Sequence, residues 1–189
     1  EPSLINMRWH RLPLKVFHVS LRKVKEKALS PHFFATNKVE EVVALDQFNS
    51  TRDGVFQLKL SKELLQWRVE KYSLANPIFF NLDDGEGELA IVIGQFNTRE
   101  LLLLDQRFSS AKSLEILVGQ VLKWAKDQGL KQLSAETSCS LTQNVFSKSL
   151  PAPRVTENAC YFAPRGDFRK LDPEKTIITP LSSDVMLRP

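Results

Sequence analysis

The sequence predicts an α/β protein built on a mostly antiparallel sheet, and three observations lead to this fold class. Strand-sized apolar segments separated by turns lie between residues 77 and 105. A long amphipathic helix over residues 114–125 ends at Gly129, because glycine favours the position that closes a helix. Strands and a shorter helix then alternate up to residue 160. The 189 residues are therefore expected to form one main domain with an extension.

Residues 1–38 are expected to be that N-terminal extension, and residues 39–189 the main domain. Apolar side chains in residues 16–28 are loosely spaced as on a helix, which predicts a short amphipathic helix there. Pro13 and Pro31 limit its length, because proline interrupts helices. Many basic residues lie in this extension, and a solvated helical face explains them better than contact with nucleic acid or a membrane surface.

The middle of the chain predicts one helix followed by a three-stranded meander. Ser61 can cap a helix that carries Trp67, and the helix must end before Asn76-Pro77 because proline disfavours a helical residue before it. Trp67 is expected to pack in the core. The following strands are separated by turns, of which Asp84-Gly85 is typical of a hairpin. The strands are predicted over residues 77–82, 88–96 and 100–105.

The second half of the chain predicts a long helix, a parallel strand and a capped shorter helix. The apolar stripe of the long helix consists of Leu114, Leu117, Val118, Val121, Leu122 and Ala125. Strand 132–135 should run parallel to strand 100–105, because a helix connects them. Ser140 with Gln143 has the spacing of a capping box for a helix that ends near Leu150. Further strands are predicted over residues 158–163 and 176–179.

Composition and charge argue against several classes of function. Apolar content of 42% and charged content of 25% are ordinary for a soluble globular protein, and no apolar run approaches the roughly 18 residues of a membrane span. The net charge of +4 is modest and no recognition motif accompanies it, so no nucleic-acid partner is expected. Two cysteines and no signal peptide indicate a reducing cytoplasm. The three histidines have no metal-ligand spacing, so no metal site is expected.

Several segments resemble one protein family. Leu64-Leu65-Gln66-Trp67-Arg68, followed by Asn76-Pro77, is similar to a Trp-Arg segment of GNAT-like proteins that are often linked to bacterial polysaccharide biosynthesis. Residues 101–160 resemble the core of the GNAT superfamily of acyl-CoA N-acyltransferases, and residues 178–185 resemble its closing segment. The resemblance implies a mostly antiparallel, partly splayed sheet with helices on both faces. It also implies acetyl-CoA or another acyl-CoA as cofactor.

The resemblance places the cofactor's phosphates at the start of the long helix. Backbone N–H groups at a helix N-terminus bind anions, and this family usually adds a glycine-rich loop there. The matching loop here has no glycine and offers hydroxyl and ammonium donors instead. The alternative is an ordinary serine-rich helix start. The implied cofactor-binding residues are Ser109, Ser110, Lys112 and Ser113.

The same comparison suggests residues for the chemistry. Phe146 stands where the family usually has a tyrosine that protonates the departing thiolate. Asp105 and Glu136, each at the end of a strand, are the candidate general bases, and solvated strand ends are the alternative. Arg68 is the candidate substrate-binding residue, with a structural ion pair to Asp184 as the alternative. Cys139 has no histidine partner and is expected to be a free, buried thiol.

The leading function is therefore acyl transfer from an acyl-CoA to a small-molecule amine, by direct attack. The acceptor would be a sugar or a surface-polysaccharide precursor. The alternative is a non-catalytic GNAT-like binding module, such as the degenerate half of a tandem protein that pairs with a second GNAT-like domain or forms a homodimer. Loss of both the glycine loop and the tyrosine favours this alternative, since a fold does not specify a function.

Overall fold

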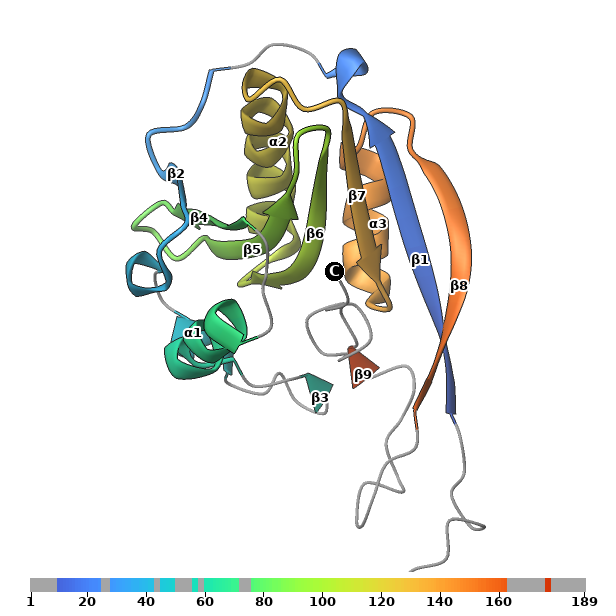
Figure 1. Ribbon diagram of the computed structural model, residues 1–189, viewed down its shortest axis with the longest axis horizontal. Helices are drawn as coiled ribbons and strands as arrows, with labels where there is room; N and C mark the ends of the chain where they lie inside the picture. Colours follow the sequence, from blue (N-terminus) through green and yellow to red (C-terminus); the bar gives the residue numbers. More distant parts are fainter. Residues whose placement is uncertain are drawn as a thin grey trace, which may run out of the picture.

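The computed structural model describes residues 10–24, 28–42, 45–49, 56–57, 60–71, 76–162 and 176–177. Its main feature is a seven-stranded sheet in the order β2-β4-β5-β6-β7-β1-β8, and a two-stranded sheet of β3 and β9 lies apart from it (Figure 1). The strands are β1 (His10–Ser20), β2 (Phe33–Thr36), β3 (Phe56–Gln57), β4 (Pro77–Asp83), β5 (Leu89–Phe96), β6 (Glu100–Phe108), β7 (Gln132–Thr137), β8 (Arg154–Phe162) and β9 (Thr176–Ile177).

Helices cover both faces of the large sheet. The α-helices are α1 (Lys62–Lys71), α2 (Ala111–Asp127) and α3 (Ser140–Ser149), and the 3₁₀ turns are η2 (Leu21–Lys23), η3 (Val39–Glu41) and η4 (Leu45–Asn49). The α2 face carries one hydrophobic core, to which α2 and α3 both contribute. The α1 face carries a second core with η3 and η4. The predicted α/β class, with a mostly antiparallel sheet and helices on both faces, is confirmed.

The centre of the predicted topology is also confirmed. Strands β4, β5 and β6 form an antiparallel meander, and β6 pairs with β7 in parallel. The helix between them buries its predicted stripe: Leu117 and Val121 are 0% exposed and Leu122 is 4% exposed. Two strands run further than predicted, to Phe108 in β6 and to Thr137 in β7.

The predicted helix over residues 16–28 is wrong. Residues 16–20 of this segment belong to β1, which pairs with β7 on one side and β8 on the other. The short turn η2 follows over residues 21–23, and residues 25–27 lie outside the described residues. Phe17 and Val19 lie in the α2-face core, while Leu14 and Val16, on the opposite face, are also buried. A strand covered on both faces loses the alternation of polar and apolar residues, so its pattern resembles that of a helix.

Residues 1–38, expected to form an extension, supply two strands to the large sheet. Strand β1 lies between β7 and β8, and β2 pairs with β4 at the opposite edge. Both strands are thus hydrogen-bonded into the same sheet as strands that follow residue 38.

Trp67 does not pack in the core as expected: it is 44% exposed. On α1 the buried positions are Leu65 and Arg68, which are three residues apart and therefore share one side of the helix. The predicted capping box at Ser140 is also wrong. Helix α3 has Cys139 at its N-cap without a side-chain bond, so Ser140 already lies inside the helix.

Candidate functional site at the parting of β6 and β7

Strands β6 and β7 part half-way along β6. Their parallel pairing runs from Glu100 with Gln132 to Leu103 with Ala135 and then stops. Beyond this point the two strands are no longer paired with each other, over residues 104–108 of β6 and 136–137 of β7. Figure 1 shows β6 turning away from β7. We call this region the strand parting. It confirms the predicted splay of the sheet.

A β-bulge lies at the start of the strand parting. On β5, the neighbours Ile93 and Gly94 pair with Asp105 and Leu103, so Leu104 is an extra residue in β6. Opposite residues of an antiparallel pair share a face, and Ile93 belongs to the α1-face core. The bulge therefore turns Asp105 onto the α1 face, where the alternation from Leu103 would have placed it on the α2 face.

Asp105 forms a buried ion pair with Arg107. Arg107 Nε donates to Asp105 Oδ1 at 3.1 Å and Arg107 Nη2 donates to Oδ2 at 2.9 Å. The side chains are 0% and 2% exposed. Both carboxylate oxygens thus accept from one guanidinium, and the two residues share the α1 face because they are two apart on a strand. This pair was not anticipated from the sequence.

Glu136 lies across the strand parting from this pair. Its neighbour Ala135 faces the α2-face core, so Glu136 projects onto the α1 face, as Asp105 does. The side chain of Glu136 is only 6% exposed. Burial raises the pKa of Glu136 above its ordinary value, because a charged carboxylate is poorly solvated there. The structure thus brings the two candidate bases to one face, with Asp105 ion-paired and Glu136 without an ion-pair partner among the described residues.

The four implied cofactor-binding residues gather at the N-terminus of α2. Ser110 Oγ accepts from the backbone N–H of Ser113, and Ser113 Oγ accepts from the N–H of Ser110, which together form a capping box. Ser109 Oγ accepts from Leu89 N–H at 2.9 Å. The serine hydroxyls therefore serve the local structure. The N–H groups of Ala111 and Lys112 have no acceptor among the described residues, as expected for a first helical turn.

Glu88 brings a carboxylate to this helix N-terminus. It accepts a hydrogen bond from Ser110 Oγ, and its Oε1 lies 3.7 Å from Lys112 Nζ. A negative charge is favourable there, because the helix dipole places partial positive charge at the N-terminus. Glu88 thus occupies the kind of environment that a phosphate would take. Sequence reasoning missed Glu88 because it comes from the β4–β5 turn, some 22 residues before Ser110.

The remaining candidates have plainer surroundings. Arg68 on α1 is 7% exposed, and Asp184, its suggested partner, lies outside the described residues. Phe146 is fully buried and packs edge-on against Phe17, with ring centroids 5.4 Å apart. Cys139 is a half-buried free thiol. The described residues contain no group of three His, Cys, Asp or Glu side chains that could hold a metal ion. No helix in the described part of the chain is long and apolar enough to cross a membrane.

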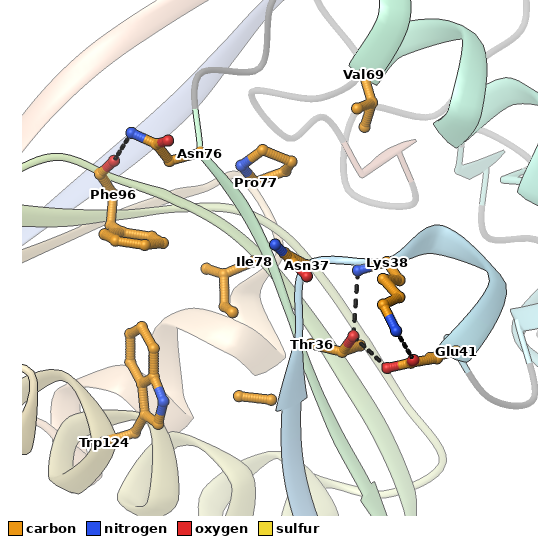
Figure 2. A pocket seen from close by; sticks show the side chains of 11 residues that line it. Thr36, Asn37, Lys38, Glu41, Val69, Asn76, Pro77, Ile78, Phe96 and Trp124 are labelled. Atoms are coloured by element: carbon orange, nitrogen blue, oxygen red, sulfur yellow. Dashed lines mark hydrogen bonds and ion pairs between the residues drawn. The ribbon is translucent and has the colours of Figure 1, made fainter.

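A pocket of about 660 Å³ lies at the other end of the sheet (Figure 2). It is lined by the start of β4, the end of β5, Trp124 on the second half of α2, Val69 of α1 and the continuous segment from the end of β2 to η3. Glu41 accepts hydrogen bonds from Thr36 Oγ1 and, at 2.9 Å, from Lys38 Nζ. These bonds lower the pKa of Glu41, and the bond from Lys38 has the larger effect. Because its lining comes from five separate segments, no sequence motif could have indicated this pocket.

Comparison with known proteins places the fold. No protein-family model and no curated protein sequence matches the chain. Among solved structures, a GCN5-related N-acetyltransferase from Anabaena variabilis matches 82% of the chain at 9% identity, with a TM-score of 0.54. A probable N-acyltransferase from Enterococcus faecalis matches 80% at 9% identity, with a TM-score of 0.58. Saccharomyces cerevisiae N-myristoyltransferase with bound myristoyl-CoA matches 88% at 11% identity, with a TM-score of 0.50.

These likenesses establish the fold of the chain. It is the fold of the GCN5-related N-acetyltransferases, or GNAT fold, as the sequence resemblance implied. The chain spans 40%, 39% and 56% of the three matched chains, about half of their length or less. The linkage to polysaccharide biosynthesis has no counterpart among these matches.

Proposed function

We propose that this chain transfers an acyl group from an acyl-CoA to an amine acceptor, with Glu136 as the general base. The observation that carries the proposal is the strand parting in a GNAT fold, with a buried carboxylate of raised pKa beside it. A base works best when its pKa lies near the working pH, and burial moves Glu136 in that direction. Asp105 is the weaker candidate for this role, because Arg107 occupies both of its oxygens.

The first turn of α2 would hold the phosphates of the acyl-CoA. The N–H groups of Ala111 and Lys112, which have no acceptor in the described part of the chain, and the exposed Lys112 ammonium fit an anion there. The serines keep the turn in shape through their capping bonds. Glu88 opposes the anion, so binding requires that its carboxylate move away from the helix N-terminus. Arg68 remains the proposed contact for the acceptor, and Phe146 contributes no proton.

The reaction would need one proton removed from the acceptor amine. Glu136 accepts that proton as the nitrogen attacks the thioester carbonyl, and the departing thiolate takes a proton from water. A thiol has a reference pKa of about 8.5, so water can supply this proton without a dedicated acid. We further propose an amino sugar as acceptor, acetyl-CoA as donor and the cytoplasm as location, all on the sequence resemblance and composition alone.

Calorimetric titration with acetyl-CoA tests the donor. We expect binding to weaken in Lys112→Ala, more so at low salt, and to strengthen in Glu88→Gln, because the variants remove an attractive and a repulsive charge. Lys131→Ala is the matched control, since Lys131 is an exposed lysine at the far end of α2's connection to β7. Absence of heat at millimolar acetyl-CoA would instead favour a non-catalytic module.

Initial rates with a panel of amino sugars and polyamines test the base. Glu136→Gln should lower turnover by about 10²–10⁴-fold, the usual contribution of a general base. Tyr161, the one tyrosine that follows Phe146 in the sequence, is the comparison, and Tyr161→Phe should leave the rate nearly unchanged. Equal losses in both variants, on folded protein, would contradict the role of Glu136.

A further inference from the structure

Strand β2 stops before its partner β4 does, and the pocket of Figure 2 lies where it stops. The register places Thr36 opposite Phe79, so residue 38 would lie opposite Pro77 if the pairing continued. Instead, the backbone N–H of Lys38 donates to Thr36 Oγ1 at 3.1 Å. The side chain of Thr36 thus takes the donor that would have extended the ladder, and the chain leaves the sheet for η3.

The unpaired start of β4 directs a carbonyl at the pocket. Asp83 N–H donates to His32 O, so the backbone groups of Asp83 point toward the β2 side, and those of every second residue of β4 do the same. Pro77 is six residues earlier, so its C=O points to this side as well, where no residue of β2 lies opposite it. Proline suits this position, because it has no N–H that would need a partner. The C=O of Pro77 is therefore a hydrogen-bond acceptor at the pocket wall.

One side of the pocket is apolar and firmly held. Ile78, Phe96 and Trp124 line this side, and all three belong to the α2-face core or pack against it. The indole of Trp124 is in edge-on contact with two phenylalanine rings, with centroids 4.9 Å from Phe80 and 5.8 Å from Phe96. Rings held in this way offer an apolar surface that need not rearrange when a ligand binds.

The other side of the pocket carries one positive and one negative charge (Figure 2). Lys38 Nζ lies 2.9 Å from Glu41 Oε1, and the two side chains are 66% and 47% exposed. Their hydrogen bond raises the pKa of Lys38 and lowers the pKa of Glu41, so both groups are charged at neutral pH. No other ionisable side chain lines the pocket, so its lining has no net charge.

We propose that this pocket binds a free α-amino acid with an apolar side chain. The ammonium and carboxylate groups of such a molecule are attached to one carbon, and Lys38 and Glu41 hold their opposite charges close together in the same way. The ligand's ammonium donates to Glu41 and to the Pro77 C=O, and its carboxylate accepts from Lys38. Its side chain lies against the apolar side of the pocket, whose volume of about 660 Å³ accommodates it. A ligand with only one of the two charges meets a like charge here.

This site is separate from the strand parting, at the other end of the sheet, and its occupancy requires no acyl-CoA. Binding of an amino acid and failure of the proposed acyl transfer are therefore independent results.

Calorimetric titration of the full chain with L-phenylalanine tests the proposal. We expect a dissociation constant of about 1 mM or lower, and three relatives of this probe should each bind at least about tenfold more weakly. Glycine lacks the apolar side chain, N-acetylphenylalanine lacks the ammonium and phenylalaninamide lacks the carboxylate. Equal binding of any relative would overturn the proposal, and for phenylalaninamide it would indicate the N-terminal residue of a peptide as the ligand. Neither heat nor a rise in melting temperature with about 10 mM L-phenylalanine would also overturn it.

Glu41→Gln and Lys38→Met test the two charges separately. Each variant should weaken the binding of L-phenylalanine by about tenfold. Glu41→Gln should also remove the preference over N-acetylphenylalanine, and Lys38→Met the preference over phenylalaninamide, because the discriminating charge is gone. Both are surface side chains, so the variants should fold, and their melting temperatures without ligand check this.

Asp127→Asn is the matched control. Asp127 pairs with Lys123 on α2, its side chain is 43% exposed, and neither residue lines the pocket. The variant removes the same charge from a similarly exposed pair, and the binding of L-phenylalanine should be unchanged. An equal loss of binding in Asp127→Asn and Glu41→Gln would mean that net charge, and not the pocket, controls binding, and it would overturn the proposal.

Discussion

Glu136 sets a pH dependence at the scale of a single residue. Burial raises its pKa in the folded protein above the ordinary value of 4.5. The unfolded chain therefore releases this proton more easily, and the contribution of Glu136 to stability is lost as the pH rises from 4.5 through the raised pKa. At neutral pH the wild-type protein therefore lacks the stability that the buried neutral carboxyl contributes below pH 4.5.

Glu136→Gln should consequently stabilise the protein at neutral pH. We expect its melting temperature at pH 7 to exceed that of the wild type by roughly 1–3 °C. The difference should vanish below pH 4.5, where the carboxyl is neutral in both states. The exposed Glu115, changed to Gln, is the control and should show no such pH-dependent gain. A gain that is the same at both pH values would rule out the buried charge as its cause. Loss of turnover together with gained stability would mark Glu136 as a functional residue.

Asp105 and Arg107 form the other charged unit at this scale. Removing one member of a buried pair leaves an uncompensated charge, so Asp105→Asn should cost about 3–5 kcal/mol in urea unfolding. Adding Arg107→Met should recover much of that loss, because the remaining charge then goes as well. The exposed pair of Lys38 and Glu41 is the comparison, and Glu41→Gln should change stability little. A double variant no more stable than Asp105→Asn would argue against the pair.

At the scale of elements, Gly94 keeps β5 close to the bulge. A Cβ at this position would lie 3.0 Å from Leu101 Cδ1 and 3.3 Å from Leu102 O, and the latter is backbone that cannot move freely. Gly94→Ala should therefore cost about 1–3 kcal/mol, measured by urea unfolding. Gly119→Ala on α2 is the matched control, since nothing lies within 4 Å of its Cβ position. That variant should be more stable by up to about 1 kcal/mol.

Elements with strong periodicity were predictable, whereas their local breaks were not. The stripe from Leu114 to Ala125 follows from spacing alone, because a helix that packs one face on a sheet carries apolar residues three or four positions apart. The capping box lies at Ser110 and Ser113, not at Ser140. Both sites have suitable residue types, so the position of the capping box depends on where the preceding strand ends. The bulge at Leu104 has no marker residue, so the faces of Asp105 and Gln106 could not be read from the sequence.

At the scale of the whole molecule, pairings between strands that follow one another in the sequence could be predicted, whereas the pairing of β1 with distant strands could not. Meander strands pair with their neighbours in the chain, and β6 and β7 pair in parallel, as expected for strands that a helix connects. Strand β1 pairs instead with β7 and β8, more than 100 residues away, and a sheet position at that separation has no local signal. The candidate site depends on such placements: Glu136 is buried partly because Val16 of β1 lies directly opposite it.

A substitution at Phe17 tests whether the whole sheet unfolds as one cooperative unit. It is 0% exposed and packs on Phe146 of α3, so Phe17→Ala should cost about 3–5 kcal/mol. Val155, directly opposite on β8, is 43% exposed, and Val155→Ala should cost less than about 1 kcal/mol. If β1 belongs to one cooperative core, amide hydrogen exchange in Phe17→Ala should quicken in β4 and β5 as well as in β7. Loss of protection confined to β7 and β8 would instead mean that the N-terminal strand and its neighbours form a separate unit.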